Sequence, residues 1–250
     1  MRLTILGSSA SYAGSGQACS GTLIQSGETS VLLDCGNGVL SMLAQVIDPL
    51  LLDAVVITHA HVDHFADLYS LQALLRYAPT GPAPVLPLYA PSGFLERMGA
   101  LLSESGRREL AQAFAVEDLA ECATIKVGDV WITPHHVDHI KPTFALVAEE
   151  ISTGRCICYT SDTAPGKAVE RAASGVHMLL AEATLPQQYA GRVPHMTARE
   201  AAQLASHVDA ERLVLTHIWP TTDREVIFRE AAKVFSGSVT VAKELDSFSV

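Results

Sequence analysis

The 250-residue sequence lacks any run of about 18 consecutive apolar residues, so it predicts no membrane-spanning helix. Its first residues, Met-Arg-Leu-Thr-Ile-Leu-Gly, contain no apolar core long enough for a signal peptide, and we expect a first strand there. The few cysteines are odd in number and scattered, which favours reduced thiols and a cytoplasmic location over a disulfide framework. They are Cys19, Cys35, Cys122, Cys156 and Cys158.

Basic residues are also scarce. The chain has 17 Lys and Arg against 27 Asp and Glu, a formal net charge of −10. Because contacts to phosphates supply most non-specific affinity for nucleic acids, this balance disfavours a long nucleic acid as partner. A small anionic substrate remains compatible with it, since bound divalent cations would reverse the charge locally.

Strand-like and helical segments mix along the chain and predict an α/β protein with two sheets and helices outside them. Strands are expected at residues 2–6, 21–26, 30–34, 54–58, 86–90, 123–127, 130–134, 143–149, 156–160, 178–181, 212–216 and 238–241. Helices are expected at residues 38–47, 65–77, 92–103, 107–114, 165–174, 197–207 and 222–235. Thr197 with Glu200, and Thr222 with Glu225, have the spacing of capping boxes. The only Pro/Gly-rich stretch, residues 79–84, is short, so we expect a single domain over residues 1–250.

The most informative segment is His-Ala-His-Val-Asp-His at residues 59–64. It follows an apolar strand and precedes a helical pattern, a usual position for a site in an α/β protein. Imidazole and carboxylate are ligands that divalent cations prefer, and a tight polar group of this kind would be costly to bury without a metal. His59, His61, Asp63 and His64 are therefore candidate ligands, and a polar turn with accidental histidines is the disfavoured alternative.

A two-metal site needs further ligands, which should lie at other strand ends. His139 precedes the strand at 143–149, Asp162 follows the strand at 156–160, and His217 ends the strand at 212–216. Asp162 suits a bridge between two metals. Asp34 also ends a strand and could orient a ligand histidine from behind. Each could instead have a structural role, and His136 is an alternative to His139.

Taken in order along nearly the whole chain, this pattern resembles the metallo-β-lactamase superfamily, which implies a four-layer αββα sandwich. The resemblance implies that His59, His61 and His139 hold one metal, that Asp63, His64 and His217 hold the other, and that Asp162 bridges them. Within the superfamily the chain most resembles the ribonuclease Z-like phosphodiesterase branch. That likeness rests on His139-x-x-Pro-Thr-Phe-Ala, Glu182-Ala-Thr184, His195-Met-Thr-Ala198 and Leu215-Thr-His217. The tRNA-processing enzymes often have His before Glu-Ala-Thr, where this chain has Ala181.

The resemblance implies a metal-dependent hydrolase with two divalent ions. Zn²⁺ is the first expectation for nitrogen and oxygen ligands, with Mn²⁺, Fe²⁺ or Co²⁺ as alternatives. Two such ions can lower the pKa of a shared water toward neutrality. Asp63 is expected to orient that water as well as to bind metal. His195 is the candidate acid for the leaving alkoxide, and Glu182 would hold its ring and favour the imidazolium. A helix-flanking structural role is the alternative for His195.

The preferred substrate is a small phosphodiester such as a 3′,5′-cyclic nucleotide. The alternative is a ribonuclease Z-type tRNA 3′-end endonuclease, whose relatives typically carry a basic arm. Only 19 residues separate Asp162 from Glu182, and no basic cluster replaces the arm. The C-terminal third resembles arm-less actinobacterial-type proteins associated with cyclic-AMP hydrolysis. A non-catalytic metal-binding or sensor protein is an alternative of another class, disfavoured by the complete ligand set. Family resemblance also suggests a homodimer, and the role of residues 79–114 stays open.

Overall fold

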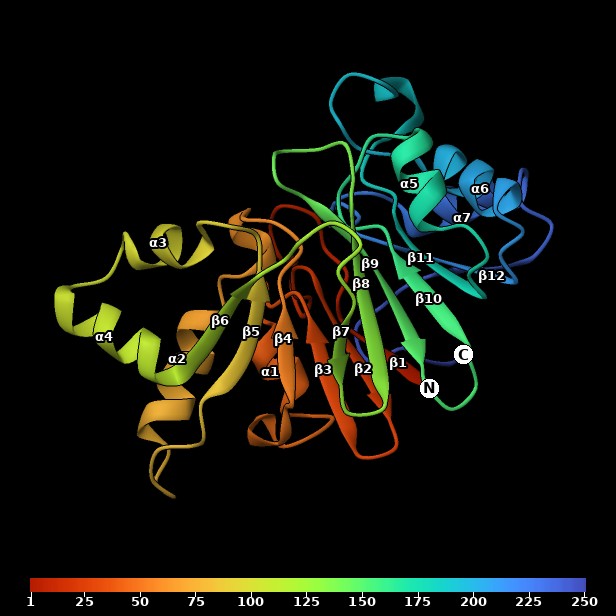
Figure 1. Cartoon of the computed structure of the whole chain (residues 1–250). Helices are drawn as coiled ribbons and strands as arrows, with labels where there is room; N and C mark the ends of the chain where they lie inside the picture. The colour runs from red at the N-terminus through yellow and green to blue at the C-terminus, as the bar shows by residue number, and fades with distance from the viewer.

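Two seven-stranded sheets packed face to face form the centre of the protein in a computed structural model that describes all 250 residues (Figure 1). The first sheet has the order β14-β1-β2-β3-β4-β5-β6. Its strands are β1 (Arg2–Gly7), β2 (Gly21–Ser26), β3 (Thr29–Leu33), β4 (Ala54–Val56), β5 (Leu86–Ala90), β6 (Phe114–Asp118) and β14 (Ser247–Ser249). Strands β3 to β6 pair in parallel, and the others pair antiparallel.

The second sheet repeats this plan with the order β13-β12-β11-β10-β9-β8-β7. Its strands are β7 (Ile125–Val127), β8 (Val130–His136), β9 (Phe144–Glu150), β10 (Cys156–Tyr159), β11 (Met178–Glu182), β12 (Arg212–Thr216) and β13 (Ser238–Val241). Strands β10 to β13 are parallel, so their carboxyl ends reach one edge of the sheet together. The sheet therefore presents several strand ends to one site.

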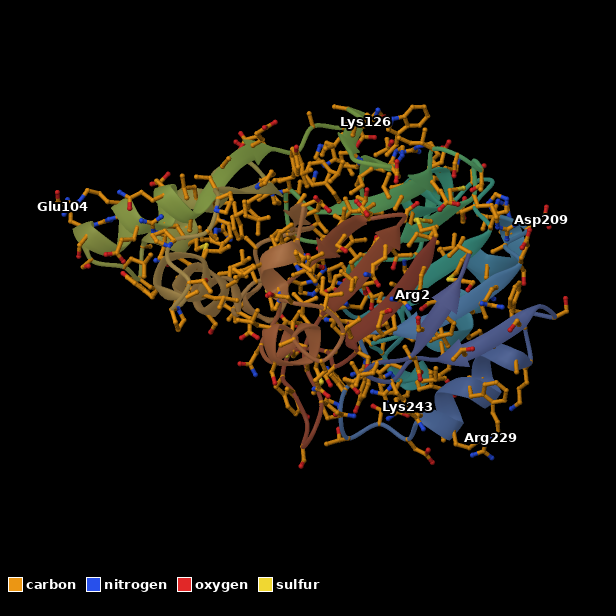
Figure 2. The ribbon with its side chains drawn as sticks, turned by 90° about the horizontal axis from the view of Figure 1, so that it is seen from below. Arg2, Glu104, Lys126, Asp209, Arg229 and Lys243 are labelled. Atoms are coloured by element: carbon orange, nitrogen blue, oxygen red, sulfur yellow. The ribbon has the colours of Figure 1, made fainter.

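Helices cover the outer faces of the two sheets and give four layers (Figure 1). The α-helices are α1 (Val39–Leu43), α2 (Leu68–Tyr77), α3 (Phe94–Gly99), α4 (Glu104–Ala113), α5 (Lys167–Ala172), α6 (Ala198–His207) and α7 (Arg224–Ala232). Short 3₁₀ turns lie at Pro49–Leu51, Val62–His64 and Gln187–Tyr189. Helices α3 and α4 reach beyond the edge of the first sheet, with Glu104 at the extremity (Figure 2). None of the helices combines the length and the apolar character that crossing a bilayer requires.

Side-chain alternation along the strands builds three apolar layers. On β3, Val31 and Leu33 join the core between the sheets, whereas Leu32 joins the core beneath α1 to α4. A third core lies between the second sheet and helices α5 to α7. A strand buried on both faces reads as a continuous apolar run, which is why β3 shows no alternation of polar residues. The predicted αββα sandwich is confirmed.

Two edge strands and one helix cap differ from the predictions. Strands β6 and β14 were not predicted, and residue 114, expected to end a helix, begins β6 instead. The capping box of Thr197 and Glu200 is present at the start of α6. The one predicted for Thr222 and Glu225 is wrong. Asp223 caps α7, because its carboxylate, one residue nearer to the helix, accepts the backbone N–H of Glu225.

Candidate metal centre

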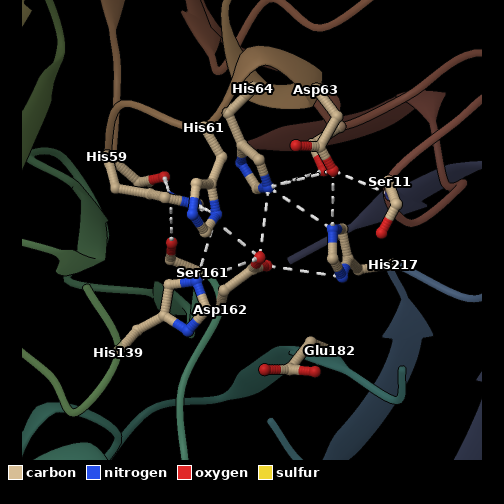
Figure 3. Close-up of polar contacts among 12 residues, drawn as sticks. Ser11, His59, His61, Asp63, His64, His139, Ser161, Asp162, Glu182 and His217 are labelled. Carbon is tan, nitrogen blue, oxygen red and sulfur yellow. Dashed lines mark hydrogen bonds and ion pairs between the residues drawn. The ribbon is translucent and has the colours of Figure 1, made fainter. Parts of the chain in front are cut away.

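The candidate ligands converge at one edge where the two sheets meet. His59 follows β4 in the first sheet, and the 3₁₀ turn Val62–His64 adds Asp63 and His64. Asp162 follows β10 and His217 follows β12, at the carboxyl ends of parallel strands. His139 comes from the loop between β8 and β9 (Figure 3). Residues far apart in the sequence are thus brought into one cluster.

The first group comprises His59, His61 and His139. The Nδ1 atom of His61 lies 3.0 Å from Nε2 of His59 and 3.2 Å from Nε2 of His139. Nitrogen ligands about 2.0–2.1 Å from one ion stand about 2.9–3.4 Å apart in tetrahedral or octahedral geometry. The separations therefore match those that one cation would impose on three imidazoles.

The second group comprises Asp63, His64 and His217. Nε2 of His217 lies 3.3 Å from Oδ2 of Asp63 and 3.4 Å from Nε2 of His64. The Oδ2 atom of Asp63 also accepts the backbone N–H of Ser11 at 2.8 Å. This hydrogen bond comes from the loop after β1 and fixes one carboxylate oxygen, while the other makes no hydrogen bond to the protein.

Asp162 lies between the two groups (Figure 3). Its Oδ2 atom is 3.7 Å from Nε2 of His59 and 3.4 Å from Nε2 of His64, and its Oδ1 atom is 3.4 Å from Nδ1 of His217. Oδ1 is buried and has no hydrogen-bond partner. A buried carboxylate oxygen without a partner is costly, and cations among the surrounding ligands would satisfy it. The residues present therefore fit bound divalent metal.

Oxygen atoms behind the histidines fix which ring nitrogen faces the centre. Nδ1 of His64 lies 2.7 Å from Oδ2 of Asp34, and Nδ1 of His217 lies 2.7 Å from Oγ1 of Thr184. Nδ1 of His139 donates to the carbonyl oxygen of Pro194 at 3.0 Å. Hydrogen bonds of this kind leave Nε2 free as a ligand and orient the ring.

Backbone strain is concentrated at the same place. Seven residues other than glycine have positive φ, and four of them lie at the centre. They are Ser11 (φ 62°), Asp34 (57°), Ser161 (55°) and His217 (51°). Each such residue costs roughly 1–3 kcal/mol, which tertiary contacts must offset, and such residues cluster at functional sites.

The electrostatics of the cluster favour a cation. Burial lowers the pKa of His139 to about 4, against the charge of Asp162. Burial also lowers the pKa of His59, so both rings are neutral and able to bind metal. Burial would lower the pKa of His64 too, but the carboxylates of Asp162 and Asp34 outweigh it and hold that pKa well above its usual value. The cluster therefore carries negative charge that a metal would neutralise.

Glu182 and His195 stand beside the cluster. Nδ1 of His195 lies 3.0 and 3.1 Å from the two carboxylate oxygens of Glu182, which is fully buried at the end of β11. Glu182 also accepts the backbone N–H of Thr163 at 2.7 Å and the hydroxyl of Thr184 at 2.5 Å. Burial opposes protonation of His195, but the bond to Glu182 prevails and raises its pKa. A ring nitrogen of His195 also lies within 4.8 Å of ligand atoms of Asp162 and His217.

The structure brings together every residue that the sequence placed at the site. His139 joins the cluster, whereas His136 stacks on Phe144 with ring centroids 4.3 Å apart. Thr184, the Pro194 carbonyl and the Ser11 amide were not predicted to have roles there. Thr184 lies in the Glu-Ala-Thr motif, which was the only available signal. The other two act through backbone atoms, which leave no mark in the residue type.

Comparison with known proteins identifies the family of this chain. A family model described as β-lactamase superfamily domain matches residues 29–218. The uncharacterized protein Rv1339 of Mycobacterium tuberculosis is 32% identical over 256 positions, covering 100% of this chain and 92% of that protein. Ribonuclease Z of Mycobacterium bovis is 30% identical over 278 positions, covering 100% and 98%. The crystal structure of the metallo-β-lactamase fold protein YhfI of Bacillus subtilis superposes with a TM-score of 0.88 at 26% identity, covering 99% of both chains. The chain therefore belongs to the β-lactamase superfamily, as a hydrolase with the metallo-β-lactamase fold.

Proposed function

We propose that the protein is a phosphodiesterase that uses two divalent metal ions to hydrolyse a small diester such as a 3′,5′-cyclic nucleotide. Zn²⁺ is the metal that we propose first. The observation that carries the proposal is the pair of ligand groups with Asp162 between them and the Glu182–His195 pair beside them. When bound, the metals would supply Lewis acidity and activate water at neutral pH. The first group, His59, His61 and His139, would hold one ion, and Asp63, His64 and His217 would hold the other.

Three residues of the chain have separate roles in the hydrolysis. Because the carboxylate of Glu182 can only accept, Nδ1 of His195 must carry a proton there. The imidazolium of His195 has its second proton on Nε2, which it donates to the leaving alkoxide oxygen as the P–O bond breaks. Asp63, held at Oδ2 by the Ser11 amide, orients the attacking water with its free oxygen. Glu182 accepts a bond from His195 throughout and stabilises its charged form.

The chain is shorter than ribonuclease Z over the aligned length, and this bears on the size of the substrate. The alignment with ribonuclease Z needs 278 positions for a chain of 250 residues, so about 28 positions of that relative have no counterpart here. The alignment with Rv1339 needs only 256. Together with a net charge of −10, this favours a small substrate over a long nucleic acid. The ribonuclease Z relative favours tRNA 3′-end cleavage as the second candidate function.

The test is turnover by protein with defined metal loading, assayed on a generic diester, on 3′,5′-cyclic AMP and on a precursor tRNA. We expect the two small diesters to be hydrolysed. Cleavage of the tRNA without turnover of either small diester would overturn the choice of substrate. No turnover of any of the three by protein that retains two metals would favour a binding or sensor protein instead.

A matched pair of variants tests whether His195 is the acid that protonates the leaving oxygen. His195→Ala should retain both metals while turnover falls by about 10²–10⁴-fold. His207→Ala, at an exposed histidine on α6, should leave both unchanged. If His195→Ala loses metal instead, His195 is a ligand together with Asp162 and His217. If its activity is unchanged, the assignment of His195 as the acid is wrong.

A further inference from the structure

A second group of ligand-type side chains lies outside the candidate metal centre and shares no residue with it. Glu121 and Cys122 lie in the loop between β6 and β7, and His135 lies near the end of β8. The Sγ atom of Cys122 is 3.6 Å from Nδ1 of His135 and 3.3 Å from Oε1 of Glu121. The same Oε1 is 3.8 Å from Nδ1 of His135. Three different donor atoms thus form one small triangle.

The size of this triangle fits a tetrahedral cation. Zinc bonds of about 2.3 Å to sulfur and about 2.0–2.2 Å to nitrogen and oxygen put ligand atoms about 3.3–3.6 Å apart. Two of the three observed separations, 3.3 and 3.6 Å, lie within this range, and the third, 3.8 Å, lies slightly above it. A hydrogen-bonded trio would not need all three edges to be similar, whereas ligands of one ion do.

Hydrogen bonds between the loop and β8 position the three side chains. The N–H of Cys122 donates to the carbonyl oxygen of Pro134 at 2.8 Å, next to His135 in β8. The N–H of His136 donates to Oε2 of Glu121, which leaves Oε1 facing the thiol and the imidazole. Just before β7, the hydroxyls of Thr124 and Thr133 lie 2.9 Å apart. The loop is therefore attached to β8 on both sides of the triangle.

We propose that Glu121, Cys122 and His135 form a third metal site, which binds a borderline-soft cation such as Zn²⁺. A thiolate beside an imidazole selects such ions over Mg²⁺ or Ca²⁺. The fourth position faces solvent, because Cys122 is exposed and the Glu121 side chain is 46% exposed. An occupant would join the loop before β7 to the strand that leads into the loop of His139.

Cadmium provides a direct probe, because a cadmium–thiolate bond absorbs in the ultraviolet and the ligands proposed for the main centre contain no sulfur. Protein whose main centre is already filled with zinc is titrated with Cd²⁺. We expect the charge-transfer band to saturate at one equivalent. Cys122→Ser should abolish it, and His135→Gln and Glu121→Gln should each weaken Cd²⁺ binding by roughly tenfold or more. Circular dichroism verifies that each variant is folded.

Cys156 supplies a matched control. It is partly exposed, and its Sγ lies 3.5 Å from Nδ1 of His177, but no carboxylate completes a triangle. Cys156→Ser should therefore keep the band in full. The proposal is overturned if wild type gives no band, if the band survives in Cys122→Ser, if it disappears in Cys156→Ser, or if neither His135→Gln nor Glu121→Gln weakens Cd²⁺ binding.

Discussion

Replacing Asp34 by asparagine tests how far a buried carboxylate behind the cluster controls metal binding. Oδ1 of Asp34 accepts the backbone N–H of Thr58 at 2.8 Å, and Oδ2 faces Nδ1 of His64 and the hydroxyl of Tyr159. In Asp34→Asn an NH₂ group takes one of these places. In place of Oδ1, the NH₂ group faces the backbone N–H of Thr58, so two donors meet and neither has an acceptor. In place of Oδ2, it favours the other tautomer of His64, which puts the proton on Nε2, the atom that should bind metal.

Both orientations of the asparagine side chain should lower the stability of the protein or its affinity for metal. One unsatisfied buried donor and the loss of charge-assisted bonds should lower the stability of the metal-free protein by about 3 kcal/mol. Loss of a carboxylate behind a ligand histidine typically weakens metal binding by about 10–100-fold, or about 1.4–2.8 kcal/mol. The weakening should fall mainly on the ion held by Asp63, His64 and His217, because Asp34 contacts His64 directly and reaches His59 of the other group only through the hydroxyl of Thr58.

Chelator competition with metal analysis measures the two affinities, and urea unfolding of the metal-free protein measures stability. Tyr159→Phe is the matched control, because it removes one donor to Asp34 and leaves the bond to His64 intact. It should cost about 1 kcal/mol of stability and leave both metal affinities close to wild type. A folded Asp34→Asn protein that binds both ions with wild-type affinity would refute the reasoning. Equal metal loss in Tyr159→Phe would also refute it.

Three further predictions concern the Glu182–His195 pair, the buried thiol of Cys158 and a helix cap. Glu182→Gln removes the charge that raises the pKa of His195, so the alkaline limb of the rate profile, measured over roughly pH 5–9, should move to lower pH; an unmoved limb would contradict this role for Glu182. Burial raises the pKa of Cys158 to about 12, whereas an unfolded thiol ionises near about 8.5, so this residue's contribution to stability is complete below about pH 8.5 and is lost as the pH rises toward 12. Cys158→Ala should therefore lessen the fall in urea midpoint between about pH 8 and pH 10, and an undiminished fall would place its origin elsewhere. Thr197→Ala should cost about 1 kcal/mol in urea unfolding through loss of the capping box, whereas Thr222→Ala, whose hydroxyl caps nothing, should cost less than about 0.5 kcal/mol; equal costs would contradict the cap assignment.

The sequence predicts most of the fold because most elements are decided by local pattern. Central strands such as β3 and β12 contain runs of three consecutive apolar residues, and α6 combines an amphipathic face with its own capping box. The edge strand β6 is different. Its pattern follows directly on α4, and only pairing with β5 separates strand from helix at Phe114. Strand β14 has three residues and exists through pairing with β1. Tertiary pairing decides such segments.

In the candidate site, too, the sequence predicts some features and not others. The ligand histidines and carboxylates are predictable because few other residue types bind divalent cations and each one lies at or near a strand end or a turn. The atoms that orient them are not. Thr184 is one threonine among many, and its hydroxyl acquires a role only because β11 and β12 place it 2.7 Å from His217. The Pro194 carbonyl and the Ser11 amide are backbone groups, so their positions depend entirely on the folded structure.

The candidate metal centre takes its ligands from both sheets, and this affects folding kinetics. His59 and His64 follow a strand of the first sheet, whereas His139, Asp162 and His217 belong to the second, so neither ligand group is complete until the sheets have docked. Contacts of such long sequence separation form late. Interactions absent from the transition state slow unfolding and leave the refolding rate unchanged. Bound metal should therefore lengthen the lifetime of the native protein, and its removal should be felt first as faster unfolding.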